Sequence, residues 1–175
     1  MATANLAMSI RPAAESEYES LGKLMVAAYS SLEGFPKPDQ MPGYYEMLAN
    51  IGRMAQKPET QLLVAVRGNE LLGGVVYFSD MAQYGSGGTA TGETNASGFR
   101  LLAVDPGARG MGVGKRLVGH CLELARAKGH GQMILHTTKA MQVAWRMYEG
   151  LGFQRSTDLD FSQGELGVFG FRKLL

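Results

Sequence analysis

The sequence predicts a mixed α/β fold, and three observations support this prediction. Short runs rich in Val and Leu alternate with segments whose apolar residues recur at helical spacing. Over residues 99–137 a strand, a glycine loop, an amphipathic helix and a second strand follow one another, an order that implies a parallel pair in the sheet. The 175 residues contain no internal repeat and no linker, so we expect a single domain over residues 1–175.

The first half of the chain is predicted to contain a short strand, two helices and a hairpin. The ranges are 8–11 for the strand, 13–32 and 44–56 for the helices, and 61–67 and 71–79 for the hairpin. Pro12 ends the first strand, and residues 34–38, rich in Gly and Pro, form a stiff loop between the helices. Gly68-Asn69-Glu70 separates the two strands of the hairpin.

The second half is predicted to complete the sheet around two more helices. The expected strands are 99–104, 133–137, 153–157 and 166–174, and the expected helices are 112–128 and 140–149. Gly129 is typical of the residue that ends a helix. Residues 85–98 are rich in Gly, Thr and Ser and are predicted to form a flexible loop.

Composition and charge exclude several classes of protein. The net charge is +1, whereas a protein built around nucleic-acid phosphates carries a strong basic excess. Cys121 is the sole cysteine, which excludes an intramolecular disulfide and a cysteine-based zinc site, and no metal is expected. Residues 1–8 lack the features of a signal peptide, and the longest near-apolar run, 71–78, is too short to cross a bilayer. We therefore expect a cytoplasmic protein without a nucleic-acid or membrane partner.

The most informative stretch lies between the strand at 99–104 and the helix that follows it. Its glycines allow the backbone to approach a ligand closely, and free N–H groups in the first turn of a helix bind anions. Arg109, Lys115 and Arg116 crowd this helix start, and residues 110–118 contain no acid. Exposed cations there oppose the helix dipole by about 0.3–1 kcal/mol each, a cost that a bound anion explains. We therefore favour a phosphate or pyrophosphate site over a solvated basic turn.

The spacing of the loop distinguishes three kinds of phosphate-binding motif. A P-loop requires glycine five positions before Gly114 and Ser or Thr after Lys115, but Arg109 and Arg116 occupy those positions. A dinucleotide fingerprint requires a third glycine three residues after Gly-x-Gly, and neither possible start provides one. The pattern that fits is Arg-x-x-Gly-x-Gly, filled by Arg109, Gly112 and Gly114.

This loop resembles the acyl-CoA loop of the GNAT superfamily of N-acetyltransferases. A second motif downstream, with Ala144, Tyr148 and a Leu-Gly-Phe that ends at Phe153, resembles the pattern that this family shows at about the same distance. The resemblance implies a mixed sheet of six to seven strands, splayed at its centre and flanked by about four helices. It also implies acetyl-CoA as the acyl donor, with residues 99–153 as the cofactor core.

The resemblance also implies roles for individual residues. Backbone N–H groups of residues 110–115 would hold the pyrophosphate, while Ala103 and Val104 would pair with the pantetheine arm. The Val104 N–H would stabilise the thioester oxygen, and Tyr148 would donate a proton to the leaving thiolate. Relatives often have asparagine where this chain has Met141, so the arm is expected to be held by backbone. The expected cofactor contacts are Ala103, Val104, Arg109, Gly110, Met111, Gly112, Val113, Gly114 and Lys115.

The base that deprotonates the amine is left open by the sequence. Relatives often place a glutamate at the start of the strand before the loop, where this chain has Ser97-Gly98-Phe99. The alternatives are Glu93, His136, Asp80 and water that relays the proton to solvent.

The acceptor is expected to bind to segments that vary among relatives, namely residues 29–45, 85–98 and 158–165. They contribute the aromatic residues Tyr29, Phe35, Tyr44 and Tyr45 and the acids Asp158, Asp160 and Glu165. The chain is thus expected to move an acetyl group from acetyl-CoA to the primary amine of a small molecule, by direct attack in a ternary complex. The alternatives are a protein N-terminus or lysine as the acceptor, and a CoA-binding regulatory domain without catalysis. A homodimer is also left open.

Overall fold

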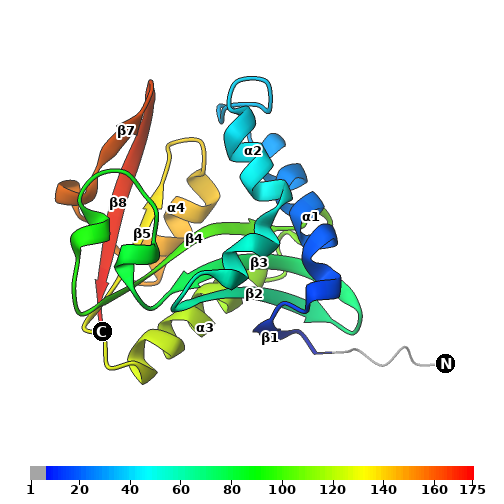
Figure 1. The fold of residues 1–175 in the computed structure, drawn as a ribbon, viewed down its shortest axis with the longest axis horizontal. Helices are drawn as coiled ribbons and strands as arrows, with labels where there is room; N and C mark the ends of the chain where they lie inside the picture. The colour runs from blue at the N-terminus through cyan, green and yellow to red at the C-terminus, as the bar shows by residue number, and fades with distance from the viewer. Residues whose placement is uncertain (1–6) are drawn as a thin grey trace.

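One mixed sheet organises the fold, which the computed structural model describes over residues 7–175 (Figure 1). The strand order is β1-β2-β3-β4-β5-β8-β6, and β7 pairs with β8 outside this path. The strands are β1 (Ser9–Pro12), β2 (Thr60–Arg67), β3 (Glu70–Phe78), β4 (Ala96–Val104), β5 (Gln132–Thr137), β6 (Gln154–Arg155), β7 (Phe161–Gln163) and β8 (Leu166–Leu174). Of the described pairs, only β4 with β5 is parallel, as the element order predicts.

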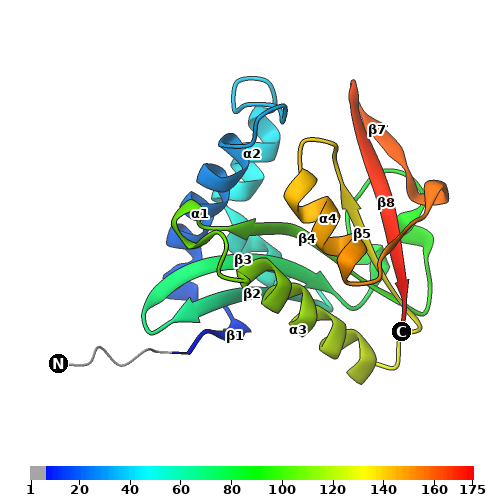
Figure 2. The ribbon, with the colours of Figure 1, turned by 180° about the vertical axis from the view of Figure 1, so that it is seen from behind.

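Two α-helices cover each face of the sheet (Figures 1 and 2). The helices are α1 (Tyr18–Ser30) and α2 (Pro42–Ala49) on one face, and α3 (Val113–Ala127) and α4 (Gln142–Gly150) on the other. Strand β2 contributes to both cores because its side chains alternate between the faces. Leu62 and Val64 pack in the cluster beneath α1 and α2, whereas Leu63 and Ala65 pack in the cluster beneath α3.

The sheet is splayed at its centre, which confirms the expectation from the family resemblance. Strands β4 and β5 pair over three residues, Ala96 to Gly98 opposite Gln132 to Ile134. Beyond Gly98, β4 continues alongside β3, whereas β5 continues alongside β8. The edge of β4 that faces β5 therefore has no strand partner over residues 99–104.

Both predicted N-terminal helices are shorter than the apolar periodicity suggests. The first was predicted from residue 13, but Glu15–Glu17 forms a 3₁₀ turn and α1 begins at Tyr18. The second was predicted over 44–56, but α2 ends at Ala49 and Ile51–Gln56 continues as a 3₁₀ helix. In both places a 3₁₀ turn maintains nearly the same facing of the apolar side chains, so periodicity alone does not distinguish it from an α-helix.

Two predictions were wrong: a flexible loop over residues 85–98 and a strand over residues 153–157. Residues 85–98 are not one flexible loop, because β4 begins at Ala96, Ala90 is fully buried, and Asn95 accepts two hydrogen bonds from the Gly131 N–H. The strand predicted over 153–157 is limited to β6, and β7 was not expected. A turn at Gly164, where φ is +61°, joins β7 to β8.

The central elements agree with the sequence prediction. The hairpin of β2 and β3 is confirmed, as is the helix after the glycine loop, which ends at Ala127 and is followed, after Lys128, by Gly129 with φ of +75°. The absence of a signal peptide was predicted from residues 1–8, of which residues 1–6 lie outside the described part of the chain. Among residues 7–175, no helix combines the length and apolar character needed to span a membrane.

Two helical glycines provide a matched test of this packing. A Cβ on Gly22 of α1 would press against the backbone carbonyl of Ala49, whereas a Cβ on Gly119 of α3 would meet no atom within 4 Å. We expect Gly22→Ala to lower the free energy of unfolding by about 1–3 kcal/mol through overpacking. Gly119→Ala should raise it by about 0.4–1 kcal/mol, because alanine restricts the unfolded chain. Urea unfolding measures both, and equal effects would contradict the close contact of α1 with α2.

Candidate active site

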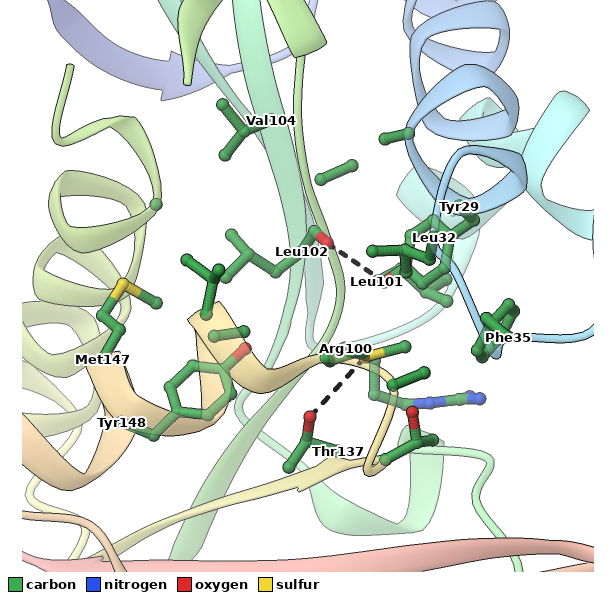
Figure 3. Close-up of a pocket in the computed structure, with 18 of the residues that line it drawn as sticks. Tyr29, Leu32, Phe35, Arg100, Leu101, Leu102, Val104, Thr137, Met147 and Tyr148 are labelled. Atoms are coloured by element: carbon green, nitrogen blue, oxygen red, sulfur yellow. Dashed lines mark hydrogen bonds between the residues drawn. The ribbon is translucent and has the colours of Figure 1, made fainter. Parts of the chain in front are cut away.

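A cleft of about 620 Å³ lies where β4 and β5 separate. Strand β4 forms one side, and residues from α1, the start of α3, the end of β5 and α4 complete the lining (Figure 3). Residues of the β7–β8 hairpin close the remaining side. The cleft thus exists because the sheet is splayed, and it brings together segments that are far apart in the sequence.

A β-bulge shapes the strand that borders the cleft. Gly74 pairs with Ala103 and Val76 pairs with Arg100, so β4 contains one residue more than β3 between these pairs. Leu101 lies in the bulge with φ of +60°, a left-handed conformation that costs a non-glycine residue about 1–2 kcal/mol. The hydroxyl of Tyr29 donates a hydrogen bond of 3.0 Å to the Leu102 carbonyl, which ties α1 to this strand.

The glycine loop opens onto one end of the cleft. Gly110 and Gly112 have φ of +80° and +77°, and a Cβ on either would meet no atom within 4 Å. Gly112 is the N-cap of α3, and no side chain caps this helix start. The conformation therefore favours glycine, and the first turn of the helix borders space that a ligand can fill.

Positive charge is concentrated at this helix start. Arg109 and Lys115 line the cleft, Arg116 follows them, and the first turn of α3 contains no acid. Arg109 donates to the Ser31 hydroxyl and Arg116 to the Met8 carbonyl. Within residues 7–175, none of the three cations forms an ion pair. The predicted concentration of uncompensated charge is therefore present, and it adds to the positive end of the helix dipole.

Most of the expected cofactor residues lie together along the cleft. Those that line it are Ala103, Val104, Arg109, Gly110, Gly112, Val113, Gly114 and Lys115. Met111 is exposed and is not among the lining residues. Met141 lines the cleft and accepts a hydrogen bond from the Thr137 hydroxyl through its sulfur, at 3.5 Å.

Tyr148 extends from α4 into the cleft with its hydroxyl directed inwards (Figure 3). Its ring packs against Phe99 and Phe153, with centroids 5.9 and 6.0 Å away, and 5% of the residue is exposed. Burial raises the pKa of this phenol well above its ordinary value of 10, so the hydroxyl is protonated at neutral pH. The hydroxyl thus has a proton to donate, and it is a weaker acid than an exposed phenol.

An aromatic wall lines the cleft on the side of α1 and α2. Tyr29, Phe35 and Tyr44 line it, with neighbouring ring centroids 5.6–5.8 Å apart in tilted and edge-on contacts. Tyr45 is buried outside the lining, where its hydroxyl donates to the Pro36 carbonyl at 2.8 Å. Three of the four predicted aromatic residues are thus brought together.

The acids predicted to accompany this wall lie elsewhere. Among the described residues that line the cleft, none is Asp or Glu. Asp160 forms a two-pronged ion pair with Arg155, at 2.8 and 2.7 Å, and Asp158 pairs with Arg172. The segment 158–165 instead contributes Phe161 and Gln163 to the lining. The sequence could not indicate these ion pairs, because they depend on how β6 and β8, which contain the two arginines, pack in the folded protein.

His136 lines the cleft, but both of its ring nitrogens are already occupied. Nε2 lies 2.8 Å from the Leu159 carbonyl, which only accepts, so Nε2 carries the proton and Nδ1 accepts the hydrogen bond of 2.9 Å from Tyr84. Burial lowers the pKa of the imidazole below its ordinary value of 6.5. His136 is therefore a neutral, hydrogen-bonded residue of the cleft wall with no free nitrogen to accept a proton.

The two carboxylates considered as bases also lie outside the cleft lining. Glu93 pairs with Arg172 at 2.7 Å. Asp80 accepts a hydrogen bond of 3.0 Å from the Ala82 N–H and thereby caps a 3₁₀ turn. Of the alternatives drawn from the sequence, a water relay is the one that agrees with this geometry.

Sequence reasoning missed several polar residues of the lining, among them Arg100 and Thr138. Arg100 is half-buried within the otherwise apolar strand β4, and a cation in such a run was the available signal. Thr138 is 4% exposed, and its hydroxyl has no hydrogen-bond partner in the described structure. Nothing in the sequence around Thr138 indicates that this residue lines the cleft.

Comparison with known proteins identifies the class to which this fold and cleft belong. The family model for the acetyltransferase (GNAT) family matches residues 24–153, which is most of the chain. The chain therefore belongs to the GNAT acetyltransferase family.

Curated relatives share a limited segment with this chain. A mycothiol acetyltransferase of Acidothermus cellulolyticus is 31% identical over 105 residues, which is 58% of this chain and 32% of that protein. N-acetyltransferase 8F1 of Rattus norvegicus is 40% identical over 58 residues, which is 33% of this chain and 26% of that protein. The matched segments thus cover about a quarter to a third of these relatives.

Solved structures share the fold over nearly the whole chain. PaiA N-acetyltransferase from Thermoplasma acidophilum, in complex with coenzyme A, has a TM-score of 0.72 at 15% identity, covering 94% of this chain and 98% of that one. A GNAT-family acetyltransferase from Staphylococcus aureus Mu50 has a TM-score of 0.70 at 17% identity, covering 97% and 99%. This likeness confirms the GNAT fold of the splayed sheet.

The environment of His136 predicts a pH dependence of stability. Because its pKa is lower in the folded protein than the ordinary value of 6.5, the unfolded chain binds more protons just below that pH. This contribution to stability is complete above pH 6.5 and is lost as the pH falls through the folded-state pKa. We expect the free energy of unfolding to fall less between about pH 7.5 and 5.5 in His136→Asn than in the wild type. Urea unfolding measures the difference, and parallel profiles would contradict it.

Proposed function

We propose that this protein transfers an acetyl group from acetyl-CoA to the primary amine of a small molecule, with both substrates bound together. One observation carries the proposal: an uncapped helix start, with open glycines and uncompensated cations, opens onto the cleft that contains the protonated hydroxyl of Tyr148. Anion binding and proton donation thus converge on one cleft.

The glycine loop fits the phosphates of coenzyme A. The space above Gly110 and Gly112 admits an anion, and the N–H groups of residues 110–115 would hold the pyrophosphate, with Arg109 and Lys115 supplying positive charge. The unpartnered edge of β4 at Ala103 and Val104 would pair with the amide-rich pantetheine arm as an added strand. These contacts use the backbone, so the apolar side chains here are compatible with the role.

The residues of the cleft support direct attack by the amine. The Val104 N–H would stabilise negative charge on the thioester oxygen, and Tyr148 would protonate the leaving thiolate. Cys121 is fully buried, and burial raises the pKa of its thiol, so the chain's cysteine offers no accessible thiolate to carry an acetyl group. With no carboxylate in the described lining, the amine would lose its proton through water to solvent.

The absence of a carboxylate from the described cleft lining also favours a second candidate, a CoA-binding regulatory domain without catalysis. Both candidates require coenzyme A to bind, but only the enzyme releases its free thiol when an amine is present. Turnover over a panel of small amines therefore separates them. A lysine-containing peptide and a peptide with a free N-terminus, included in the panel, test the alternative of a protein acceptor.

Two substitutions at Gly112 test the binding of phosphate. Asn and Asp have nearly the same shape and tolerate the left-handed conformation about equally, so they differ mainly in charge. We expect Gly112→Asp to weaken acetyl-CoA binding at least about tenfold more than Gly112→Asn, because its carboxylate repels the phosphates. Isothermal titration calorimetry gives both dissociation constants. Equal affinities in the two folded variants would rule out an anion at this loop.

Removal of one hydroxyl tests the chemistry. Tyr148→Phe should lower kcat by about 100-fold, the lower end of what a positioned acid contributes, because a thiolate is already a good leaving group. The dissociation constant for acetyl-CoA should change little. Tyr45→Phe is the matched control, since its hydroxyl lies outside the cleft lining, and it should retain the wild-type kcat. Thiol release measures both, and an unchanged kcat in Tyr148→Phe would remove its assigned role.

A further inference from the structure

Arg100 is the charged residue at the aromatic end of the cleft. The other cations of the lining, Arg109 and Lys115, belong to the glycine loop. In Figure 3 the guanidinium of Arg100 extends towards the side where Phe35 lies and away from Tyr148. The aromatic part of the cleft therefore has a positive charge that does not come from the glycine loop.

The hydrogen-bonding capacity of Arg100 is largely unused. Its Nη1 donates to the Tyr84 carbonyl at 2.9 Å, and its guanidinium lies 5.7 Å from the centre of the Tyr84 ring. No carboxylate of the described chain lies within 4 Å of it. A half-buried guanidinium without a counterion is costly, and its planar fork of donors matches a carboxylate.

A second polar group in the same cleft also lacks a partner. The Thr138 hydroxyl is buried and forms no hydrogen bond in the described structure, although most buried hydroxyls do. Thr138 lines the cleft from the end of β5, whereas Arg100 lines it from β4. Both residues thus offer unused hydrogen-bond donors to the same cleft, and oxygen atoms of a ligand would satisfy them.

We propose that Arg100 binds a carboxylate of the acceptor, so that the acceptor is a small amino acid with an apolar side chain. Tyr29, Phe35 and Tyr44 provide the apolar wall for that side chain, and Thr138 provides a further hydrogen bond. The inference rests on the proposed acetyl transfer and specifies its acceptor. The lack of acids in the described lining agrees with it, because the cleft then attracts the carboxylate and does not stabilise the ammonium form of the amine.

Matched acceptors test the preference for a carboxylate. L-phenylalanine, L-leucine and L-methionine are each compared with the corresponding amide, at equal concentrations of unprotonated amine, by thiol release. Because a charge-assisted hydrogen bond is at stake, we expect kcat/KM for each acid to exceed that of its amide by about 10- to 100-fold. A ratio near or below one in the wild type would overturn the proposal while leaving acetyl transfer in place.

Variants assign the preference to Arg100. In Arg100→Gln the acid-to-amide ratio should fall to about one, and Arg100→Lys should retain part of it because the charge is kept. The ratio compares two substrates on one protein, so a partial loss of folded protein cancels. Lys57→Met removes a cation that contacts the same turn, through the Gln83 carbonyl, but lies outside the cleft lining, and it should leave the ratio unchanged. An unchanged ratio in Arg100→Gln would overturn the assignment.

A binding measurement separates this inference from the proposed function. N-acetyl-L-phenylalanine and its amide are titrated calorimetrically into wild type and Arg100→Gln, each saturated with coenzyme A. Tighter binding of the acid, lost in the variant, supports the carboxylate site even if no amine is acetylated. Equal binding of acid and amide to the wild type overturns the site, whatever the outcome of the activity assay.

Discussion

The loss of pairing between β4 and β5 after Gly98 is the constraint on which the other features depend. A strand edge without a partner leaves backbone groups to be satisfied by something else. Tyr29 satisfies one of them, the Leu102 carbonyl, and thereby fixes α1 beside the cleft. The glycine loop then follows from the end of this strand, so its N–H groups face the same space. The site is in this sense a consequence of an interrupted sheet.

The distribution of ion pairs explains why the cleft has a basic character although the chain is nearly neutral. Arg155 and Arg172 pair with Asp160, Asp158 and Glu93, on the β6–β8 side of the molecule. Hydrogen bonds from Ser156 and then Arg172 lower the pKa of Asp158, and a hydrogen bond from Arg155 lowers that of Asp160. The ion pairs connect the segments that close the cleft. Acids that serve this structural purpose are not available to the acceptor end.

The parts of the site that the sequence predicted are those encoded locally. The loop was identifiable because its glycines, its cations and the start of its helix are contiguous, and their conformations follow from residue type. The surroundings of Arg100 could not be identified in this way, because Tyr84 and the residues that line the cleft with Arg100 come from separate elements. His136 shows the same limit: its two hydrogen-bond partners lie 52 and 23 residues away, and they determine that it is neutral.

The bulge at Leu101 changes the phase of the side-chain alternation along β4. In a regular strand, residues two apart share a face, yet Phe99 packs beneath α3 and α4, whereas Leu101 and Ala103 pack beneath α1 and α2. Deleting one bulge residue would give Val75 a single partner and leave the pairs Gly74–Ala103 and Val76–Arg100 unchanged, so Ala103 and Val104 would keep their present faces. Elsewhere in the strand, a lost or added residue that no bulge absorbs would turn every later side chain to the opposite face. The bulge is therefore the one described position of β4 at which evolution can change the length of the strand by a residue without turning Ala103 and Val104 over.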